Sequence, residues 1–158
     1  MTQPIPPGRD GLIPHLVCEP CAAAIEFYVK ALGATEIARM TIPGGTKIMH
    51  AQIAIGDRVI FLADDFPEFC PDGSQRSPKA LGGTPVTIHQ YVTDCDAAIK
   101  RAEAAGATVV MPPQDMFWGD RYGSVIDPFG HSWSFATHQR DMTPAEMDEA
   151  ARATFAQG

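Results

Sequence analysis

The sequence predicts an α+β fold made of two tandem βαβββ modules and a C-terminal helix. Residues 14–25 align without a gap on residues 88–99, and both copies continue to a Gly-Ala-Thr tripeptide. Hydrophobic periodicity also gives the order strand, helix and three strands twice. Such a repeat indicates one supersecondary unit used twice, whose equivalent residues face each other across a pseudo-twofold axis. His15 and His89 are equivalent in this alignment, so a cleft with two histidines is the first functional hypothesis.

Apolar spacing places the elements of the first copy. Residues 11–18 alternate as a strand, with Leu12, Leu16 and Cys18 on one face and Ile13, His15 and Val17 on the other. Over 22–32 apolar residues recur every three or four positions, which predicts a helix that Gly33 ends. Three further strands are expected at 35–42, 47–55 and 59–63.

The same signals recur in the second copy. Asp94 is a candidate cap for a helix over 96–105, and Gly106 is its stop. Strands are expected at 85–92, 107–111, 122–126 and 131–136. A last helix begins with the capping box of Thr143-Pro144-Ala145-Glu146 and extends to about Phe155.

These elements imply one domain with two flanking segments. We expect a flexible N-terminus at 1–10, a single domain at 11–140 and a C-terminal helical segment at 141–158. Within the domain, module one covers 11–66, a connection rich in Pro, Gly and Ser covers 67–83, and module two covers 84–140.

Composition limits the partners of this domain. The chain has 158 residues, of which 45% are hydrophobic and 20% are charged, as in ordinary globular proteins. Its net charge of -7 argues against nucleic acid, because neutralising phosphates needs clustered Lys and Arg. No stretch reaches the roughly 18 apolar residues of a membrane span, and no signal peptide is recognisable at the N-terminus. We therefore expect a cytoplasmic protein whose partners are small molecules, with no nucleic acid and no membrane.

Four cysteines add a minor alternative. Cys18-Glu19-Pro20-Cys21 has the CxxC spacing of a redox pair or half of a zinc site, but no second CxxC completes a set of four sulfur ligands. Without a secretion signal, cysteines are more often thiols than disulfides. We interpret all four as thiols and keep redox or zinc chemistry at the CxxC pair as the alternative.

Several segments carry a family resemblance. They are Ala24-Ile25-Glu26-Phe27-Tyr28 with Leu32-Gly33, His50-Ala51, Leu81-Gly82-Gly83-Thr84-Pro85, Trp118-Gly119-Asp120-Arg121 and Asp127-Pro128-Phe129-Gly130-His131. Together with the doubled order of elements, they resemble the vicinal oxygen chelate superfamily of glyoxalases, bleomycin-resistance proteins and extradiol dioxygenases, and within it the PhnB-like branch. The resemblance covers about 12–141. It implies two curved sheets that form a cup with helices outside, and a homodimer.

The resemblance also implies where a metal would bind. In metal-using members, each module supplies one ligand from its first strand and one from its last, at the bottom of the cup. Here the first-strand positions hold Ile13 and Thr87, and the last-strand positions hold Phe61 and Ser134. None of these offers the imidazole, carboxylate or thiolate that a divalent metal prefers. We therefore predict no metal at the usual site.

Three histidines keep metal chemistry open. His15 and His89 lie two residues beyond the expected ligand positions, and strand alternation turns both inward. His50 would join them if Met49, Ala51 and Ile53 pack toward the helices. His15, His50 and His89 could then hold Zn, Fe or Mn with an open coordination position. The alternatives are hydrogen-bonded residues in a pocket wall, or metal-free catalysis with His15 and His89 as acid and base.

The other inward positions describe a small-molecule site of mixed character. Its aromatic members are Phe61, Tyr91, Trp118 and Tyr122, and its polar members are Gln52, Thr87, Arg121, Ser132 and Ser134. Arg121 either clamps a carboxylate or phosphate or pairs with Asp120. Trp118 either covers the cup or plugs the core. His131 and His138 are interpreted as turn and strand-end residues.

Two functions from different classes follow. The first is a small-molecule-binding protein of the bleomycin-resistance kind, which needs a cup lined with aromatic and histidine side chains but no metal. Its ligand would be aromatic or anionic. The second is an enzyme of the same superfamily, a lyase, isomerase or dioxygenase, that uses either a displaced metal or acid-base chemistry at His15 and His89.

Overall fold

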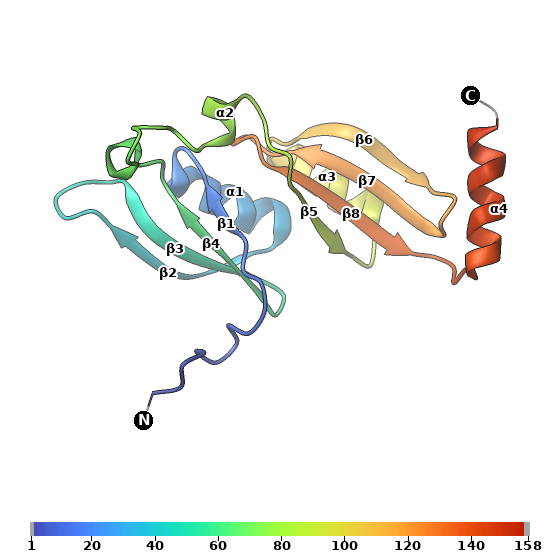
Figure 1. Ribbon diagram of the computed structural model, residues 1–158, viewed down its shortest axis with the longest axis horizontal. Coiled ribbons are helices and arrows are strands. Elements are labelled where there is room, and N and C mark those ends of the chain that lie inside the picture. Colours follow the sequence, from blue (N-terminus) through green and yellow to red (C-terminus); the bar gives the residue numbers. More distant parts are fainter. Residues whose placement is uncertain (1, 157–158) are drawn as a thin grey trace. The chain divides into compact units, whose positions relative to one another are not determined.

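The computed structural model describes residues 2–156, so Met1 of the expected N-terminal segment and residues 157–158 of the expected C-terminal segment lie outside the described residues. It confirms the α+β fold class, with two four-stranded sheets and helices (Figure 1). The chain divides into two compact units. The first comprises the residues up to Pro85 together with Pro128–His131, and the second comprises Val86–Asp127 together with the residues from Ser132 onward.

The first unit has the predicted order of elements. Along the chain these are β1 (His15–Val17), α1 (Cys21–Leu32), β2 (Thr35–Thr41), β3 (Ile48–Ile55) and β4 (Arg58–Ala63). The sheet order is β1-β4-β3-β2, with β1 parallel to β4 and the other neighbours antiparallel. α1 packs on β3 and β2. Its buried Ile25, Tyr28 and Leu32 recur at the predicted spacing, and Gly33 ends it in the left-handed conformation.

The second unit repeats this arrangement with β5 (Thr87–Tyr91), α3 (Cys95–Ala105), β6 (Thr108–Asp115), β7 (Asp120–Ile126) and β8 (Ser132–His138). The sheet order is β5-β8-β7-β6, and α3 packs on β6, β7 and β8. The Asp94 side chain caps α3 by accepting a hydrogen bond from the Ala97 N–H. In both units we call the sheet face opposite the unit's own helix the open face.

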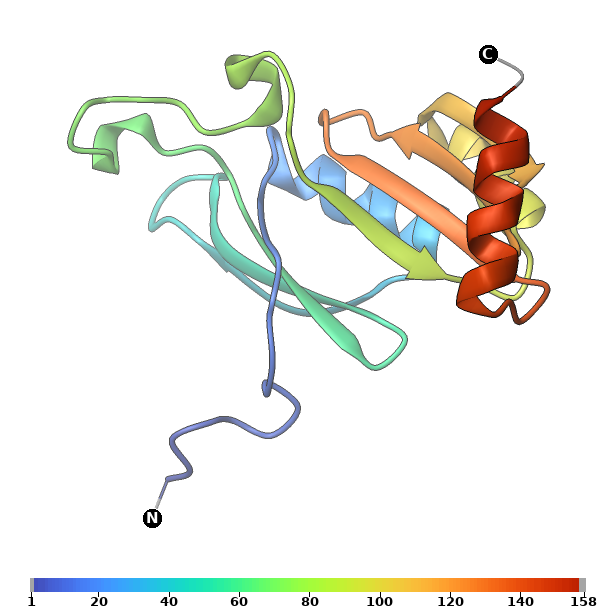
Figure 2. The same ribbon diagram turned by 45° about the vertical axis from the view of Figure 1, so that its right-hand side comes forward.

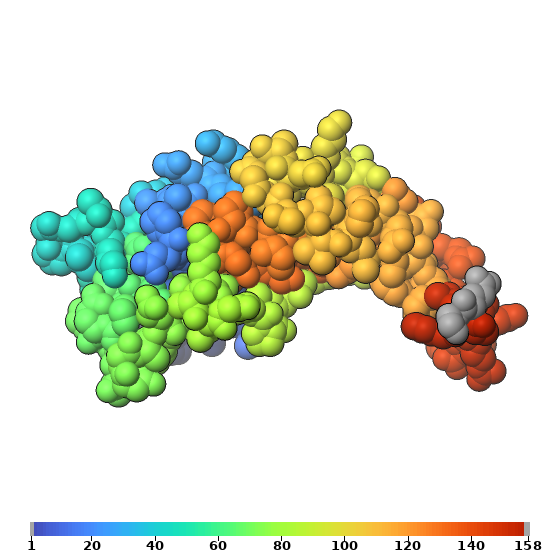
Figure 3. Space-filling model, turned by 90° about the horizontal axis from the view of Figure 1, so that it is seen from above, coloured from blue at the N-terminus to red at the C-terminus, as the bar shows by residue number. Residues whose placement is uncertain are grey.

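A last helix, α4 (Pro144–Phe155), follows the second sheet. The predicted capping box is present, since the Thr143 and Glu146 side chains each accept a hydrogen bond from the other residue's backbone N–H. None of the residues of α4 is buried. The space-filling view shows it in red, projecting from the strands of its own unit (Figure 3). None of the helices in the described part of the chain has the length and apolar character needed to cross a membrane.

Strand register confirms that the two units are copies. His15 is the register partner of Phe61 in the first unit, and His89 is that of Ser134 in the second. The start of each helix is tied down in the same way. The Cys21 N–H donates to the Asp64 carboxylate, and the Cys95 N–H donates to the Thr137 hydroxyl, at 2.9 and 2.8 Å.

The segment between β4 and β5 has more structure than the predicted loop. It contains the short 3-10 helix η1 (Pro67–Phe69) and the single-turn helix α2 (Pro78–Leu81), both drawn in green in Figure 2. The buried Asp65 carboxylate holds the segment in place by accepting hydrogen bonds from the backbone N–H groups of Arg76 and Ser77. Hydrophobic periodicity does not reveal which side chains accept hydrogen bonds from the backbone N–H groups of a loop, so it does not predict this structure.

Two strand predictions need correction in the first unit. The first strand begins at His15 and not at Gly11, and Leu12 is fully exposed. Pro14 explains the late start, because it has no N–H for the ladder. Met49 is exposed and does not pack toward the helix. The register shifts between Met40 and Thr41, so that Met49 is the extra residue of a β-bulge, which reverses the alternation at that point.

Candidate functional site

The open face of the first unit carries a cluster of His15, His50 and Phe61. The ring centroids of His50 and Phe61 are 4.7 Å apart, and each ring lies 6.0 Å from that of His15. All three contacts are edge-to-face, a favourable geometry for aromatic rings. Burial and the neighbouring His50 lower the pKa of His15. His15 is therefore a neutral imidazole near pH 7.

A chain of hydrogen bonds extends this cluster to the N-terminal segment. Arg9 donates from Nη2 to Gln52 Oε1 at 2.8 Å, and Gln52 Nε2 lies 3.1 Å from His50 Nε2. A guanidinium only donates, so it must meet the amide oxygen. The amide nitrogen then faces His50 and donates to its Nε2. Arg9 thereby orients the Gln52 amide toward His50.

The open face of the second unit carries His89 among polar and aromatic partners. Its Nδ1 lies 2.8 Å from Ser134 Oγ. Its ring is edge-to-face with Tyr91, with centroids 4.9 Å apart, and stacks with Tyr122 at 6.0 Å. Thr87 and Ser132 share a 3.0 Å hydrogen bond on the same face. Ser134 is buried beneath this cluster, so it orients His89 and does not present its hydroxyl to a ligand.

Asp120 organises the rest of that face. Its carboxylate is 5% exposed and accepts hydrogen bonds from Tyr91 Oη at 3.0 Å, Trp118 Nε1 at 3.2 Å and His138 Nδ1 at 2.8 Å. Burial alone would raise the pKa of Asp120, but the bonds from His138 and Tyr91 lower it overall. Two of the predicted aromatic residues are thus held by one buried carboxylate.

Comparison with known proteins identifies the family. The sequence profile of the glyoxalase/bleomycin resistance protein/dioxygenase superfamily matches residues 13–135. The chain belongs to this superfamily. An uncharacterized protein of Mycobacterium bovis is 50% identical over 150 residues, which are 95% of each chain.

Solved structures of the superfamily fold are also similar. TioX from Micromonospora sp. ML1 is 27% identical with a TM-score of 0.61, and the match covers 81% of this chain and 99% of that one. A glyoxalase/bleomycin resistance protein/dioxygenase from Nocardioides is 25% identical with a TM-score of 0.62, covering 85% and 87% of the two chains. The assignment to the PhnB-like branch stays a prediction.

The residues at the superfamily's metal positions do not fit a divalent metal. Register places Phe61 and Ser134 at equivalent points of β4 and β8, as predicted from the resemblance. Thr87 bonds to Ser132, and Ile13 precedes β1. None of these side chains is an imidazole, carboxylate or thiolate. Among residues 2–156, no three His, Cys, Asp or Glu side chains gather as a metal-binding group.

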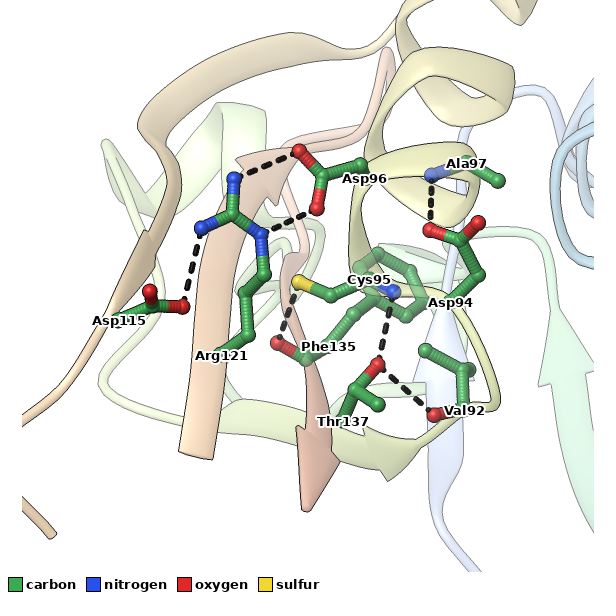
Figure 4. Close-up of polar contacts among 9 residues, drawn as sticks. All are labelled: Val92, Asp94, Cys95, Asp96, Ala97, Asp115, Arg121, Phe135 and Thr137. Carbon is green, nitrogen blue, oxygen red and sulfur yellow. Dashed lines mark hydrogen bonds and ion pairs between the residues drawn. The ribbon is translucent and has the colours of Figure 1, made fainter. Parts of the chain in front are cut away.

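Arg121 lies on the opposite face from the one predicted. It forms ion pairs with Asp96, in the first turn of α3, and with Asp115 at the end of β6 (Figure 4). Strand alternation explains the difference, because Tyr122 occupies the open face and its neighbour must point toward the helix. Arg121 therefore neither points toward a ligand on the open face nor pairs with Asp120. Its ion pairs join helix to sheet.

Arg121 supports a first prediction. Arg121→Gln removes both ion pairs from the helix side of the sheet, so we expect a modest loss of thermal stability that salt diminishes. Ligand binding on the open face should be unchanged. Melting curves at low and high salt, with Arg58→Gln as the matched control for an exposed arginine, test this. An equal shift in both variants would contradict it.

The CxxC cysteines are thiols and are not joined in a disulfide. Cys18, Cys21 and Cys95 are buried, and Cys70 is partly exposed. Burial and then the Asp64 charge raise the pKa of Cys21 to about 12. Since the thiolate is the nucleophile and metal ligand, this environment opposes redox or zinc chemistry at the pair.

Arg9, Asp120 and His138 are site residues that the sequence patterns do not predict. Arg9 falls in the segment expected to be flexible. Asp120 is expected only as a partner for Arg121, and His138 only as a strand-end residue. The alternation of Asp120 with Tyr122 along β7 places both on one face, and this signal could have identified the carboxylate.

His138 makes stability dependent on pH. Hydrogen bonds to Asp120 and then Asp141 raise the pKa of His138 above 6.5. When folding raises the pKa of a histidine, the charged ring stabilises the folded protein. This stabilisation is complete at pH values below the pKa of the unfolded chain, and it is lost as pH rises through the pKa of the folded protein. We therefore expect the stability difference between wild type and His138→Gln to shrink as pH rises above the ordinary histidine pKa of about 6.5. Urea unfolding at several pH values measures it, and a constant difference would refute it.

Proposed function

We propose that this protein binds a small molecule, as a metal-independent binding member of the superfamily. One observation carries the proposal. Each unit presents an equivalent histidine on its open face, and each histidine contacts an aromatic ring: His15 meets Phe61 and His89 meets Tyr91. Fixed hydrogen bonds lie beside both rings, from Gln52 to His50 in the first unit and between His89 and Ser134 in the second. Rings beside a few fixed polar groups are typical of small-molecule sites. His15 and His89 are both exposed, so a ligand can reach them.

The ligand chemistry follows from the side chains. Phe61 in the first unit and Tyr91 and Tyr122 in the second offer ring surfaces. Gln52, Thr87 and Ser132 offer hydrogen bonds. A planar aromatic compound with polar substituents is therefore the expected ligand class.

A thermal shift screen tests the proposal. Aromatic acids, amides and phenols at millimolar concentration should include at least one compound that raises the melting temperature, since a ligand that binds only the folded form stabilises it. His15→Ala should abolish the shift of a compound bound to the open face of the first unit, and His89→Ala that of a compound bound to the open face of the second. Arg58→Gln, on an exposed hairpin residue, should not change it. If no compound shifts the wild-type protein, the proposal fails.

Metal-free acid-base catalysis is the second candidate. The lowered pKa of His15 favours it, because a neutral imidazole can accept a proton near pH 7. An isomerase or lyase substrate would then be turned over with a rate that falls as pH drops through the pKa of His15. Loss of turnover in His15→Ala, with ligand binding retained, would support this enzyme.

The alternative with a displaced metal stays a prediction. It requires His15, His50 and His89 together, although His50 Nε2 already accepts a hydrogen bond from Gln52. Metal analysis of protein purified without a tag tests it. A stoichiometric transition metal that is lost in His15→Ala and His89→Ala would replace the metal-independent proposal.

Homodimer formation and a cytoplasmic location also stay predictions. Sedimentation equilibrium measures the first directly. Cell fractionation measures the second.

A further inference from the structure

Arg9 stands on the open face of the first unit, in a local turn that presets its position. The Arg9 N–H donates to the Pro6 carbonyl at 3.1 Å, and Gly8 between them has φ +70°. Pro7 and Gly8 are the residues that a type II turn favours at its two central positions. Proline and the turn reduce the backbone freedom that Arg9 would lose on binding a ligand.

The charge of Arg9 is not neutralised by the protein. Its two hydrogen-bond acceptors are the Gly8 carbonyl and the Gln52 amide oxygen, both uncharged. Among residues 2–156, Arg9 forms no ion pair with a carboxylate. A guanidinium has five N–H donors, so donors remain for an oxyanion beyond the two bonds formed.

The donors of Arg9 lie beside an aromatic surface. Gln52, to which Arg9 bonds, is the register partner of Phe61, and Phe61 is the register partner of His15. Arg9, Gln52, Phe61 and His15 therefore form one row across β3, β4 and β1, with the His50 ring 4.7 Å from that of Phe61. A cation at one end of a row of rings matches a ligand with an anionic group at one end of a planar ring.

We propose that Arg9 is the anion-binding residue of this face and that the ligand is an aromatic carboxylic acid. The inference rests on the proposed binding function and specifies its ligand class. The carboxylate accepts hydrogen bonds from the remaining Arg9 N–H groups, and the ring packs against Phe61 and His50. Arg9 supplies a permanent positive charge at this end of the row. Arg9 thus takes the carboxylate-binding role that was one of the two alternatives for Arg121.

Calorimetric titration with matched acids and amides tests this. The probes are 2-naphthoate and 2-naphthamide, which share the ring and differ in charge. We expect wild type to prefer the acid by about tenfold or more, because hydrogen bonds to charged groups are stronger than neutral ones. Arg9→Gln should lose this preference and keep its affinity for the amide. Arg9→Lys should keep part of it, since the charge remains without the planar fork.

The controls separate this inference from the proposed function. Arg58→Gln removes an exposed arginine that is paired with Asp57, and it should bind the acid like wild type. Equal affinity of wild type for acid and amide, or an undiminished preference in Arg9→Gln, would overturn the role of Arg9 while leaving small-molecule binding intact. Binding of neither probe to wild type would count against both.

Discussion

Replacement of Asp64 by alanine should destabilise the protein by about 2 to 4 kcal/mol, the largest effect we expect from one substitution outside the apolar core. Its buried carboxylate accepts hydrogen bonds from the backbone N–H groups of Cys21, at 2.9 Å, and Ile48, at 2.6 Å. These bonds tie the start of α1 to the start of β3. Alanine would leave two N–H groups without acceptors where no water reaches, since neither Cys21 nor Ile48 is exposed.

Matched variants make this measurement specific. Asp64→Asn keeps one acceptor oxygen but turns an N–H₂ group toward the second backbone N–H, so most of the loss should persist. Asp57→Ala removes an exposed aspartate and should cost little. Urea unfolding of the three variants gives the free energies. A loss for Asp64→Ala no larger than that for Asp57→Ala would show that the two hydrogen bonds contribute nothing.

Helices and strands were predictable where a single local sequence signal determines them. The doubled order of elements, the glycine that ends α1 and the capping box of α4 follow from local sequence and are present. Errors arose where a second feature overrode the pattern. Pro14 delays β1, and the bulge at Met49 reverses the alternation of β3. Prolines also hid the far half of β6, which continues through Pro112 and Pro113 at the sheet edge.

The candidate site was predictable only as far as strand alternation reaches. Register confirms that His15 and His89 are equivalent, because the repeat fixes their positions. Arg121 and Tyr122 could not both face one side, and alternation applied to that pair would have excluded Arg121. The bonds of Arg9 to Gln52 and of Asp120 to Tyr91 and His138 join residues 43, 29 and 18 positions apart in the chain, which periodicity does not encode.

Replacement of Asp120 by alanine should have the second largest effect, and it should appear on the open face of the second unit. Three donors, from Tyr91, Trp118 and His138, lose one acceptor. Tyr91 and His138 are exposed enough to bond to water instead, whereas Trp118 is only partly exposed. We therefore expect the free energy of unfolding to fall by about 1 to 3 kcal/mol, mainly because the buried position of the Asp120 carboxylate is left empty.

The local consequence distinguishes an organising role from simple loss of stability. Without Asp120, the pKa of His138 should fall toward its ordinary value, because its first hydrogen-bond partner is gone and only Asp141 remains. Trp118 should change its fluorescence, since its indole N–H no longer meets a carboxylate.

Asp120→Asn keeps the shape of the side chain but not its charge, so it should lower the pKa of His138 while retaining more stability than alanine. Titration of His138 by NMR in wild type and both variants measures the first effect. An unchanged His138 titration in both variants would mean that Asp120 does not hold this imidazole.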